Sequence, residues 1–116
     1  MSRRTDYDGR TFASLQNSGS GEVGPATCFY YHQQDDMVWA EYSGGSILRG
    51  MLIARANADG NLDMRYQHIN AAGELMTGVC QSALEILPDG RYRLHEKWQW
   101  TSGDRSAGES VIEEVK

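Results

Sequence analysis

The segment RYRLHEKWQWTS, residues 91–102, decides the fold class of this chain of 116 residues. Its large apolar side chains recur at every second position, at Tyr92, Leu94, Trp98 and Trp100. A period of two puts these side chains on one face of a β-strand, whereas a helix would scatter them. Glu96 falls in phase with them, so we predict a strand with one carboxylate on an otherwise apolar face.

The same alternation recurs along the rest of the chain. Residues 61–70 carry one face of large side chains, formed by Leu62, Met64, Tyr66 and His68. Enrichment in β-branched and aromatic residues between turn sequences predicts six further strands. The eight predicted strands cover residues 11–16, 27–33, 37–43, 47–56, 61–70, 74–87, 91–102 and 110–115. Tight-turn pairs such as Asp59-Gly60 and Asp89-Gly90 separate them, so successive strands are expected to pair antiparallel.

A meander of eight strands protects its sheet edges either by closing into a barrel or by folding into a β-sandwich. Gly50 and Gly78 lie inside predicted strands, where a small residue allows the bulge or sharp coiling that closure requires. We therefore predict an all-β, single-domain, antiparallel up-and-down β-barrel of about eight strands, with a β-sandwich as the alternative. Polar residues 1–8 predict a flexible N-terminus, residues 9–116 the barrel domain, and residues 17–25 a long loop.

Composition and charge exclude several classes of protein. Lys and Arg number 11 against 16 Asp and Glu, which gives a net charge of -5. Because nucleic-acid binding needs clustered cations and these are scattered, we expect no nucleic-acid partner. No apolar window approaches the length of about 20 residues that a membrane span needs, so we expect no membrane partner. MSRRTDYDGR at the start has no apolar signal core, which predicts a cytoplasmic protein.

Motifs for metal, cofactor or covalent chemistry are missing from the sequence. Cys28 and Cys80 lie far apart without a CxxC or CxxH pattern, so we interpret them as buried free thiols. The GxSxG, P-loop, GxGxxG and HExxH patterns are absent as well. We therefore expect no metal, no cofactor and no catalytic residues. An enzyme would have to rest on strand residues that converge inside the barrel.

Two charged residues fall on predicted apolar faces, Glu96 and Arg49, which is in phase with Ile47, Met51 and Ile53. Burial of such groups is costly unless something pairs with them. In one hypothesis they are the polar fixtures of a small-molecule pocket whose aromatic walls come from Tyr42, Tyr66, Trp98 and Trp100. In the other, Arg49 and Glu96 form a buried ion pair that fixes the register, and the aromatic rings fill the core.

The alternation also places two of the three histidines, His32 and His68, on faces that carry large apolar side chains. Two inward histidines are compatible with part of a metal site or with a general base. The chain has no HxH or HxxxH spacing, so a hydrogen-bonded interior histidine is the favoured interpretation. The candidate ligand-binding residues are Arg49, Tyr66, His68, Glu96, Trp98 and Trp100.

Four stretches of the sequence carry a family resemblance that spans roughly residues 7–114. They are YDGRTF at residues 7–12, VWAEYSGG at 38–45, RYQH at 65–68 with GELMTG at 73–78, and LHEKWQWTSGD at 94–104. In these stretches the chain resembles a family of small bacterial proteins, many of which carry the name N-acetylglutamate synthase. The expected fold is similar in outline to the calycin barrels, lipocalin-like and avidin-like. The chain has no pyrophosphate loop that opens a helix, so the sequence does not support the acetyl-transfer activity in that name.

Three functions remain open from the sequence. The first is non-catalytic binding of a small molecule inside the barrel, by a monomer or homodimer. The second is a structural or protein-interaction module with a filled barrel, which contacts its partner through exposed aromatic residues such as Trp39 or Tyr31. The third is an enzyme.

Overall fold

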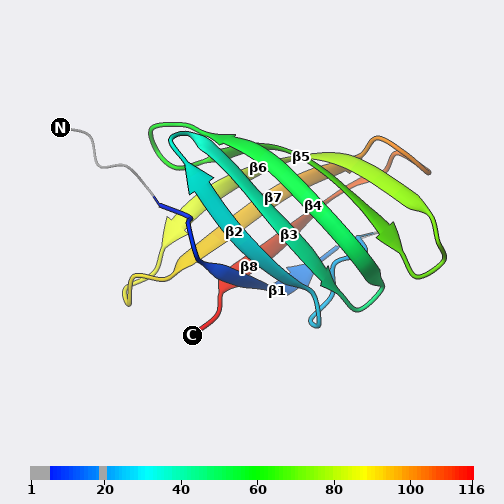
Figure 1. Ribbon diagram of the computed structural model, residues 1–116, viewed down its shortest axis with the longest axis horizontal. Helices are drawn as coiled ribbons and strands as arrows, with labels where there is room; N and C mark the ends of the chain where they lie inside the picture. Colours follow the sequence, from blue (N-terminus) through cyan, green and yellow to red (C-terminus); the bar gives the residue numbers. More distant parts are fainter. Residues whose placement is uncertain (1–5, 19–20) are drawn as a thin grey trace.

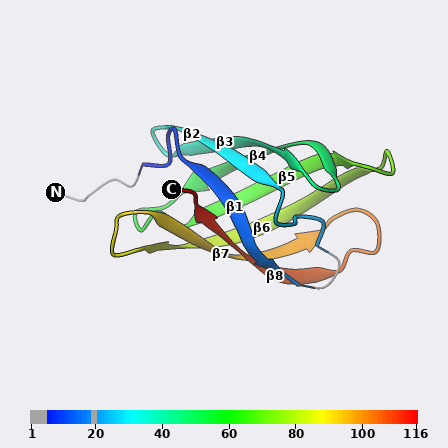
Figure 2. The same ribbon diagram turned by 90° about the horizontal axis from the view of Figure 1, so that it is seen from below.

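The computed structural model describes residues 6–18 and 21–116, which form a closed antiparallel barrel of eight strands (Figure 1). The strands are β1 (Thr11–Asn17), β2 (Cys28–Gln34), β3 (Met37–Gly44), β4 (Ile47–Ala56), β5 (Leu62–Asn70), β6 (Leu75–Ile86), β7 (Tyr92–Trp100) and β8 (Ala107–Glu114). Each pairs with its neighbour in chain order, and β1 pairs with β8 to close the sheet (Figure 2). The predicted barrel is confirmed, and the sandwich alternative is not adopted. None of the described residues forms a helix with the length and apolar character needed to cross a membrane.

Two of the eight strands follow their predicted alternation from end to end. In β5 and β7 the side chains at every second position face the interior, including Met64, His68, Leu94 and Trp98, each at most 7% exposed. The turns before these strands are also as predicted, since Gly60 and Gly90 adopt φ values of +83° and +90°. Residues with a Cβ rarely adopt this left-handed region, which explains why glycine follows aspartate in both turns.

Arg49 lies on the outer surface, so its predicted inward orientation is wrong. The register shifts between Ile47 and Arg49, which pair with Asn70 and Ile69 on β5. This β-bulge adds one residue and reverses the phase of everything after it. Leu52 and Ala54 consequently face the core, while Met51 and Ile53 are more than half exposed.

The phase of β2 is also opposite to the predicted one. Phe29 and Tyr31 point inward and are 5% and 1% exposed, whereas Tyr30 is 49% exposed. His32 therefore lies on the outer surface, where its Nε2 atom is 2.8 Å from Oε1 of Glu41. Two successive tyrosines gave the alternation no unique phase. His68 is buried, as expected, and Tyr31 is unavailable as a surface contact.

The N-terminal segment closes one end of the barrel, which we call the closed end. The turns β2–β3, β4–β5 and β6–β7 lie there, together with both termini (Figure 1). Tyr7 is fully buried, its backbone N–H donates to Oε1 of Gln33 at 2.8 Å, and its hydroxyl donates to the Gly60 carbonyl. Tyr7 belongs to the stretch of residues 1–8 that was predicted to be flexible, and in the structure its ring is packed into the core. Residues 1–5 of that stretch lie outside the described range. The polar N-terminal segment thus contributes one buried aromatic ring, that of Tyr7, to the core.

The opposite end, which we call the open end, is covered by the loop that joins β1 to β2. The predicted loop over residues 17–25 is observed as residues 18–27, of which 19 and 20 lie outside the described range. Thr27 is fully buried and donates from Oγ1 to the Gly44 carbonyl at 3.0 Å. The Ser46 hydroxyl donates to the Glu22 carbonyl at 3.0 Å. These bonds hold the described part of the loop against the β3–β4 turn.

Candidate functional site

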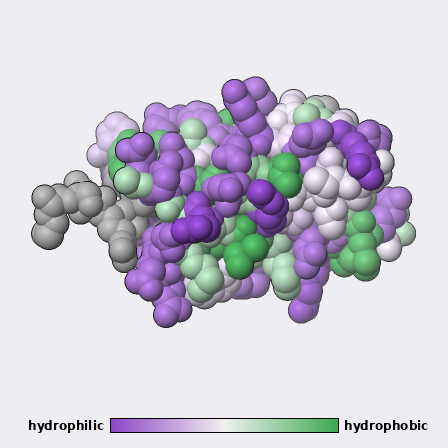
Figure 3. All heavy atoms as spheres, turned by 90° about the horizontal axis from the view of Figure 1, so that it is seen from above, coloured by the Kyte–Doolittle hydropathy of each residue, from purple (hydrophilic) through white to green (hydrophobic). Residues whose placement is uncertain are grey.

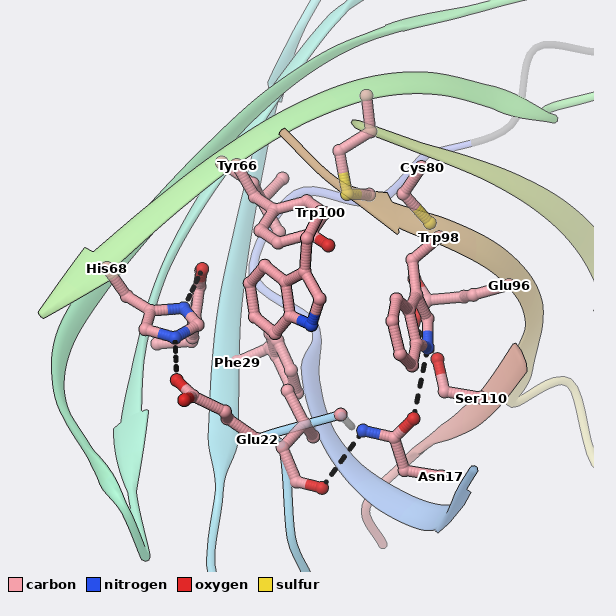
Figure 4. A pocket seen from close by; sticks show the side chains of 15 residues that line it. Asn17, Glu22, Phe29, Tyr66, His68, Cys80, Glu96, Trp98, Trp100 and Ser110 are labelled. Carbon is pink, nitrogen blue, oxygen red and sulfur yellow. Dashed lines mark hydrogen bonds and ion pairs between the residues drawn. The ribbon is translucent and has the colours of Figure 1, made fainter. Parts of the chain in front are cut away.

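A cavity of about 50 Å³ lies inside the open end of the barrel. Its walls are aromatic, and its polar lining comes from four side chains: Asn17, Glu22, Glu96 and Ser110, beside the imidazole of His68 (Figure 4). A water molecule needs about 10–15 Å³ on this measure, so the space suits several waters or a compact ligand. An eight-stranded barrel is wide enough to hold one small ligand. In this barrel the cavity lies at the open end.

The aromatic walls form a continuous set of edge-to-face and tilted contacts. The ring centroids of Trp98 and Trp100 are 5.7 Å apart, and the Trp100 ring lies 5.6 Å from those of both Tyr66 and His68. On the opposite wall the Phe29 and Tyr42 centroids are 5.0 Å apart. These separations are favourable for aromatic pairs and fix the rings against one another. The cavity walls are therefore rigid on the side of β7.

Glycines on neighbouring strands make room for three of these rings. Tyr42 pairs with Gly50 across β3–β4, Tyr66 with Gly78 across β5–β6, and Trp98 with Gly108 across β7–β8. A Cβ atom at any of the three glycines would lie within 2.5 Å of its partner ring. Each ring thus lies over bare backbone, an arrangement known to pin register in sheets. Gly50 and Gly78 were predicted to allow the bulge or sharp coiling that barrel closure requires. In the structure each of them lies opposite an aromatic ring.

Glu96 is held between two serine hydroxyls from the flanking strands. Ser82 and Ser110 are its direct cross-strand neighbours, and their Oγ atoms donate to Oε2 at 3.1 Å and to Oε1 at 3.0 Å. Burial raises the pKa of Glu96 from 4.5 to about 7, and the hydrogen bonds from Ser110 and Ser82 oppose that rise. Part of the side chain faces the cavity and is accessible there. The carboxyl group is therefore poised between its two protonation states near neutral pH.

The loop contributes an acidic side chain that contacts the buried histidine. Oε1 of Glu22 is 2.7 Å from Nε2 of His68, and the Tyr42 hydroxyl is 2.9 Å from Nδ1 of the same ring. Nδ2 of Asn70 donates to Oε2 of Glu22 at 3.0 Å. Since a carboxylate only accepts hydrogen bonds, Nε2 of His68 carries a proton in this arrangement. Both oxygens of Glu22 are thus engaged with the barrel wall.

A second contact ties the other wall to the start of the loop. Nε1 of Trp98 donates to Oδ1 of Asn17 at 3.0 Å, and Nδ2 of Asn17 donates to the Val23 carbonyl at 3.1 Å (Figure 4). The indole N–H, which is costly to bury without a partner, is therefore satisfied by the end of β1. The loop and Trp98 are held by one amide side chain.

The remaining titratable groups of the cavity are neutral at physiological pH. Burial raises the pKa values of the Tyr42 and Tyr66 hydroxyls and of the Cys80 thiol, and the Glu96 charge adds to each rise. A thiol whose pKa is raised is a poor nucleophile. Among residues 6–18 and 21–116, the Cys80 thiol has the Ser82 hydroxyl as its hydrogen-bond partner, and not a histidine. Nor do three His, Cys, Asp or Glu side chains of this range converge as metal ligands would.

The structure brings together five of the six candidate residues from the sequence: Tyr66, His68, Glu96, Trp98 and Trp100. Arg49 is the sixth, and because it points outward the hypothesis of an Arg49–Glu96 ion pair is wrong. Sequence reasoning missed Glu22 and Asn17. Glu22 approaches the cavity from a loop and Asn17 from a strand end, where no periodicity applies. Ser82 and Ser110 were missed as well, although their phase with the buried Cys80 and Ile112 is a signal by which alternation could have found them. Their contact with Glu96 depends on the register.

Fold and site together define a closed eight-stranded β-barrel with an aromatic cavity at its open end, lined by the two carboxyl groups of Glu22 and Glu96. A family model described as avidin-like protein matches residues 5–115. The chain therefore belongs to the avidin-like protein family, which agrees with the predicted calycin-like outline. Comparison with curated proteins gave no match, and comparison with solved structures gave none either.

Proposed function

We propose that this protein binds a small molecule inside the open end of its barrel and does not transform it. The observation that carries the proposal is the cavity of about 50 Å³, which coexists with a fully packed closed end in the same barrel. Protein interiors are normally packed without voids, so a space retained between six aromatic and imidazole rings is unusual in a core of this size. Ligand sites are typically such apolar recesses with a few fixed polar groups.

The polar groups of the cavity are fixed before any ligand arrives. Both serine hydroxyls on Glu96 and the Tyr42–His68–Glu22 contacts hold these side chains in single orientations. A preorganised site loses less conformational entropy on binding, which favours affinity for a compact ligand. Binding, rather than catalysis, also fits the neutral thiol and tyrosines around Glu96, because none of them is an activated nucleophile. The proposed ligand is not a nucleic acid, since the net charge is -5 and the Lys and Arg residues are scattered.

Native mass spectrometry tests the proposal directly. The intact mass of the purified protein under native conditions is compared with the mass of the denatured chain. We expect a reproducible excess of small-molecule size, which disappears on denaturation and identifies the ligand by its mass. A native mass equal to the denatured mass, unchanged after incubation with a metabolite extract, would contradict the proposal.

A pair of variants places the bound molecule. Glu96→Ala removes the carboxyl group that faces the cavity, so we expect the mass excess to be lost while the near-ultraviolet circular dichroism of the barrel is kept. Glu109→Ala is the matched control, because Glu109 lies on β8 next to Ser110 but is exposed on the outer face. Equal ligand retention in the two variants would remove Glu96 from the site.

A second candidate function, protein interaction, is favoured by the outer face of β4. Leu48, Met51 and Ile53 are 59%, 52% and 55% exposed on this strand, and Met37 on β3 is 40% exposed. On the face that Figure 3 shows, apolar side chains lie as patches among hydrophilic ones. Exposed apolar groups gathered on one strand are typical of contact surfaces. Light scattering of wild type and Ile53→Glu separates a homodimer, which the charge would dissociate, from a monomer.

A further inference from the structure

We propose that the ligand of the barrel cavity is a compact organic cation, such as an amidinium, guanidinium or primary ammonium group, that binds between Glu96 and the aromatic walls. This inference rests on the proposed binding function and specifies the charge of the ligand. It follows from an imbalance of charge among the side chains that line the cavity.

The cavity contains acceptors of positive charge and no fixed cation. Two carboxyl groups, those of Glu22 and Glu96, line it, and no Lys or Arg is among the described lining residues. Glu22 already contacts His68 and Asn70 through its two oxygens. Among the described residues, Glu96 receives hydrogen bonds from two neutral serine hydroxyls and from no cation. A buried carboxylate without a countercharge is costly, so a cation that reaches it gains what the protein does not supply.

Each oxygen of Glu96 retains room for a further hydrogen bond. A carboxylate has about four lone-pair sites, and the serines occupy one on each oxygen. The planar N–H fork of an amidinium or guanidinium group matches two carboxylate oxygens.

The walls of the cavity suit the same ligand. Tyr66, Trp98 and Trp100 present ring surfaces within one contiguous cluster that also lines the cavity. The faces of aromatic rings, those of tryptophan above all, attract cations within about 6 Å of the ring centre. An anionic ligand would meet the same rings and two carboxyl groups, which disfavours it. The small volume excludes long side groups unless the loop over residues 18–27 moves.

Among Glu96 and the tyrosine and thiol groups around it, Glu96 is the group whose charge is expected to change near neutral pH. The tyrosines and the thiol that interact electrostatically with it come from the N-terminal segment and from strands β2, β3, β5 and β6: Tyr7, Tyr31, Tyr42, Tyr66 and Cys80. All five have raised pKa values and stay neutral between pH 6 and pH 8. The flanking residues from β6 and β8, Ser82 and Ser110, do not titrate, and the His68 imidazole is in direct contact with Glu22.

A charge series of nearly identical shape tests the inference. Benzamidinium, benzamide and benzoate, and the smaller acetamidinium, acetamide and acetate, are titrated into the protein at pH 8 and followed by tryptophan fluorescence and calorimetry. We expect the cation of at least one series to bind at least tenfold more tightly than its neutral analogue, and no binding of the anion. Because the pKa of Glu96 is about 7, cation affinity should rise about tenfold from pH 6 to pH 8.

Two substitutions locate the effect. Glu96→Gln keeps the shape of the side chain and removes its charge, so we expect the preference for the cation and its pH dependence to disappear together. Glu109→Gln removes an exposed carboxylate from the outer face of β8 and is expected to leave both unchanged. The pH dependence of the wild-type protein tests the same point should Glu96→Gln fail to fold.

The outcomes separate this inference from the binding function on which it depends. Equal or tighter binding of the amide or the carboxylate, or no binding by either series, overturns the cationic ligand. If native mass spectrometry still shows a bound molecule of neutral or anionic chemistry, the binding function stands and only the inference falls. If neither a retained molecule nor any titrated compound is found, both fall.

Discussion

Both ends of the barrel carry aromatic side chains, but those of the closed end pack against one another, whereas those of the open end line a cavity. At the closed end Tyr7, Phe12 and Tyr31 are at most 1% exposed, and the Phe12 and Tyr31 ring centroids are 4.8 Å apart. At the open end the rings of Trp98, Trp100 and Tyr66 surround an unfilled space. The difference lies in what each end receives from outside the strands. The closed end receives an aromatic ring from the N-terminal segment, whereas the open end receives a carboxylate from a loop.

This contrast shows how aromatic composition can serve either packing or binding. A ring such as Tyr7 fills volume and brings one hydroxyl, which the Gly60 carbonyl satisfies. A carboxylate such as Glu22 must keep hydrogen-bond donors around it, and His68 and Asn70 supply them at the rim. At the rim, hydrogen bonds between the loop and the barrel wall therefore take the place of a further packed ring.

Removal of the ring that fills the closed end is expected to cost the most stability. Tyr7→Ala deletes a fully buried side chain that contacts Phe12, Tyr31 and Tyr92. Truncations of this kind typically destabilise by about 3–5 kcal/mol. Urea denaturation measures the change, and Tyr30→Ala, on the exposed face of β2, is the control with an expected loss below about 0.5 kcal/mol. Similar losses in both variants would contradict the role of Tyr7 as a plug.

The charge of Glu96 is expected to make the open end a source of pH-dependent instability. Its pKa is raised in the folded state, from 4.5 to about 7, so the folded protein binds the proton more tightly than the unfolded chain. The stability tied to this group is fully present below about pH 4.5 and is lost as the pH rises to about 7. At about 1.4 kcal/mol per pKa unit the loss is on the order of 3 kcal/mol.

Denaturation of wild type and Glu96→Gln between pH 5 and pH 8 measures this effect. Glutamine cannot ionise, so the variant should gain stability relative to wild type across the window, and the gap should stay constant above pH 8. A gap that does not change with pH would mean that Glu96 is ionised without cost, and the cavity would then be well hydrated.

Two histidine–glutamate pairs allow the rim of the cavity to be compared with the outer surface. The Nε2–Oε1 distance is 2.7 Å for His68–Glu22 and 2.8 Å for His32–Glu41, but the His68 side chain is 1% exposed and the His32 side chain 37%. Glu22→Ala leaves a buried donor without a partner, which costs about 1–3 kcal/mol. Glu41→Ala removes a solvent-screened pair and should cost less than about 0.5 kcal/mol.

Hydrogen exchange shows where the Glu22 effect acts. In Glu22→Ala the amides of residues 21–27 should exchange faster while those of β7 keep their protection, because local opening follows the loss of local contacts. Faster exchange throughout the barrel, or the same free-energy change for both variants, would show that the pair at the rim is not a specific fastening of the loop.

The smallest change in stability is expected at a glycine. In Gly78→Ala the new Cβ would lie within 2.5 Å of the end of the Tyr66 ring. That ring borders the cavity and can move into it, so we expect a loss of about 1 kcal/mol or less and a strong reduction in ligand retention. Gly24→Ala is the control, because a Cβ there meets no atom within 4 Å. Undiminished ligand retention in Gly78→Ala would show that Tyr66 does not shape the site.

The strands and the barrel were predictable because alternation and turn chemistry are local. Residues 61–70 and 91–102 carried their own phase, and five cavity residues followed from it. Arg49 was misplaced because a one-residue bulge leaves no mark in the pattern, and His32 because large side chains occupy both faces of β2. Glu22, Asn17 and Tyr7 act from a loop, a strand end and a terminal segment. Their positions depend on tertiary contacts that no periodicity encodes.

The glycines opposite Tyr42, Tyr66 and Trp98 determine how much space each of these rings has on its backbone side. The aromatic lining stays the same while the room beside each ring is set by a position that carries no side chain. One methyl group at Gly78 would meet the Tyr66 ring and narrow the recess from that side, whereas at Gly50 or Gly108 it would also lie within 3 Å of His68 or Ser18. Related barrels can therefore differ in the size of molecule they admit through single substitutions on the backbone side of a ring, without any change among the residues that touch the ligand.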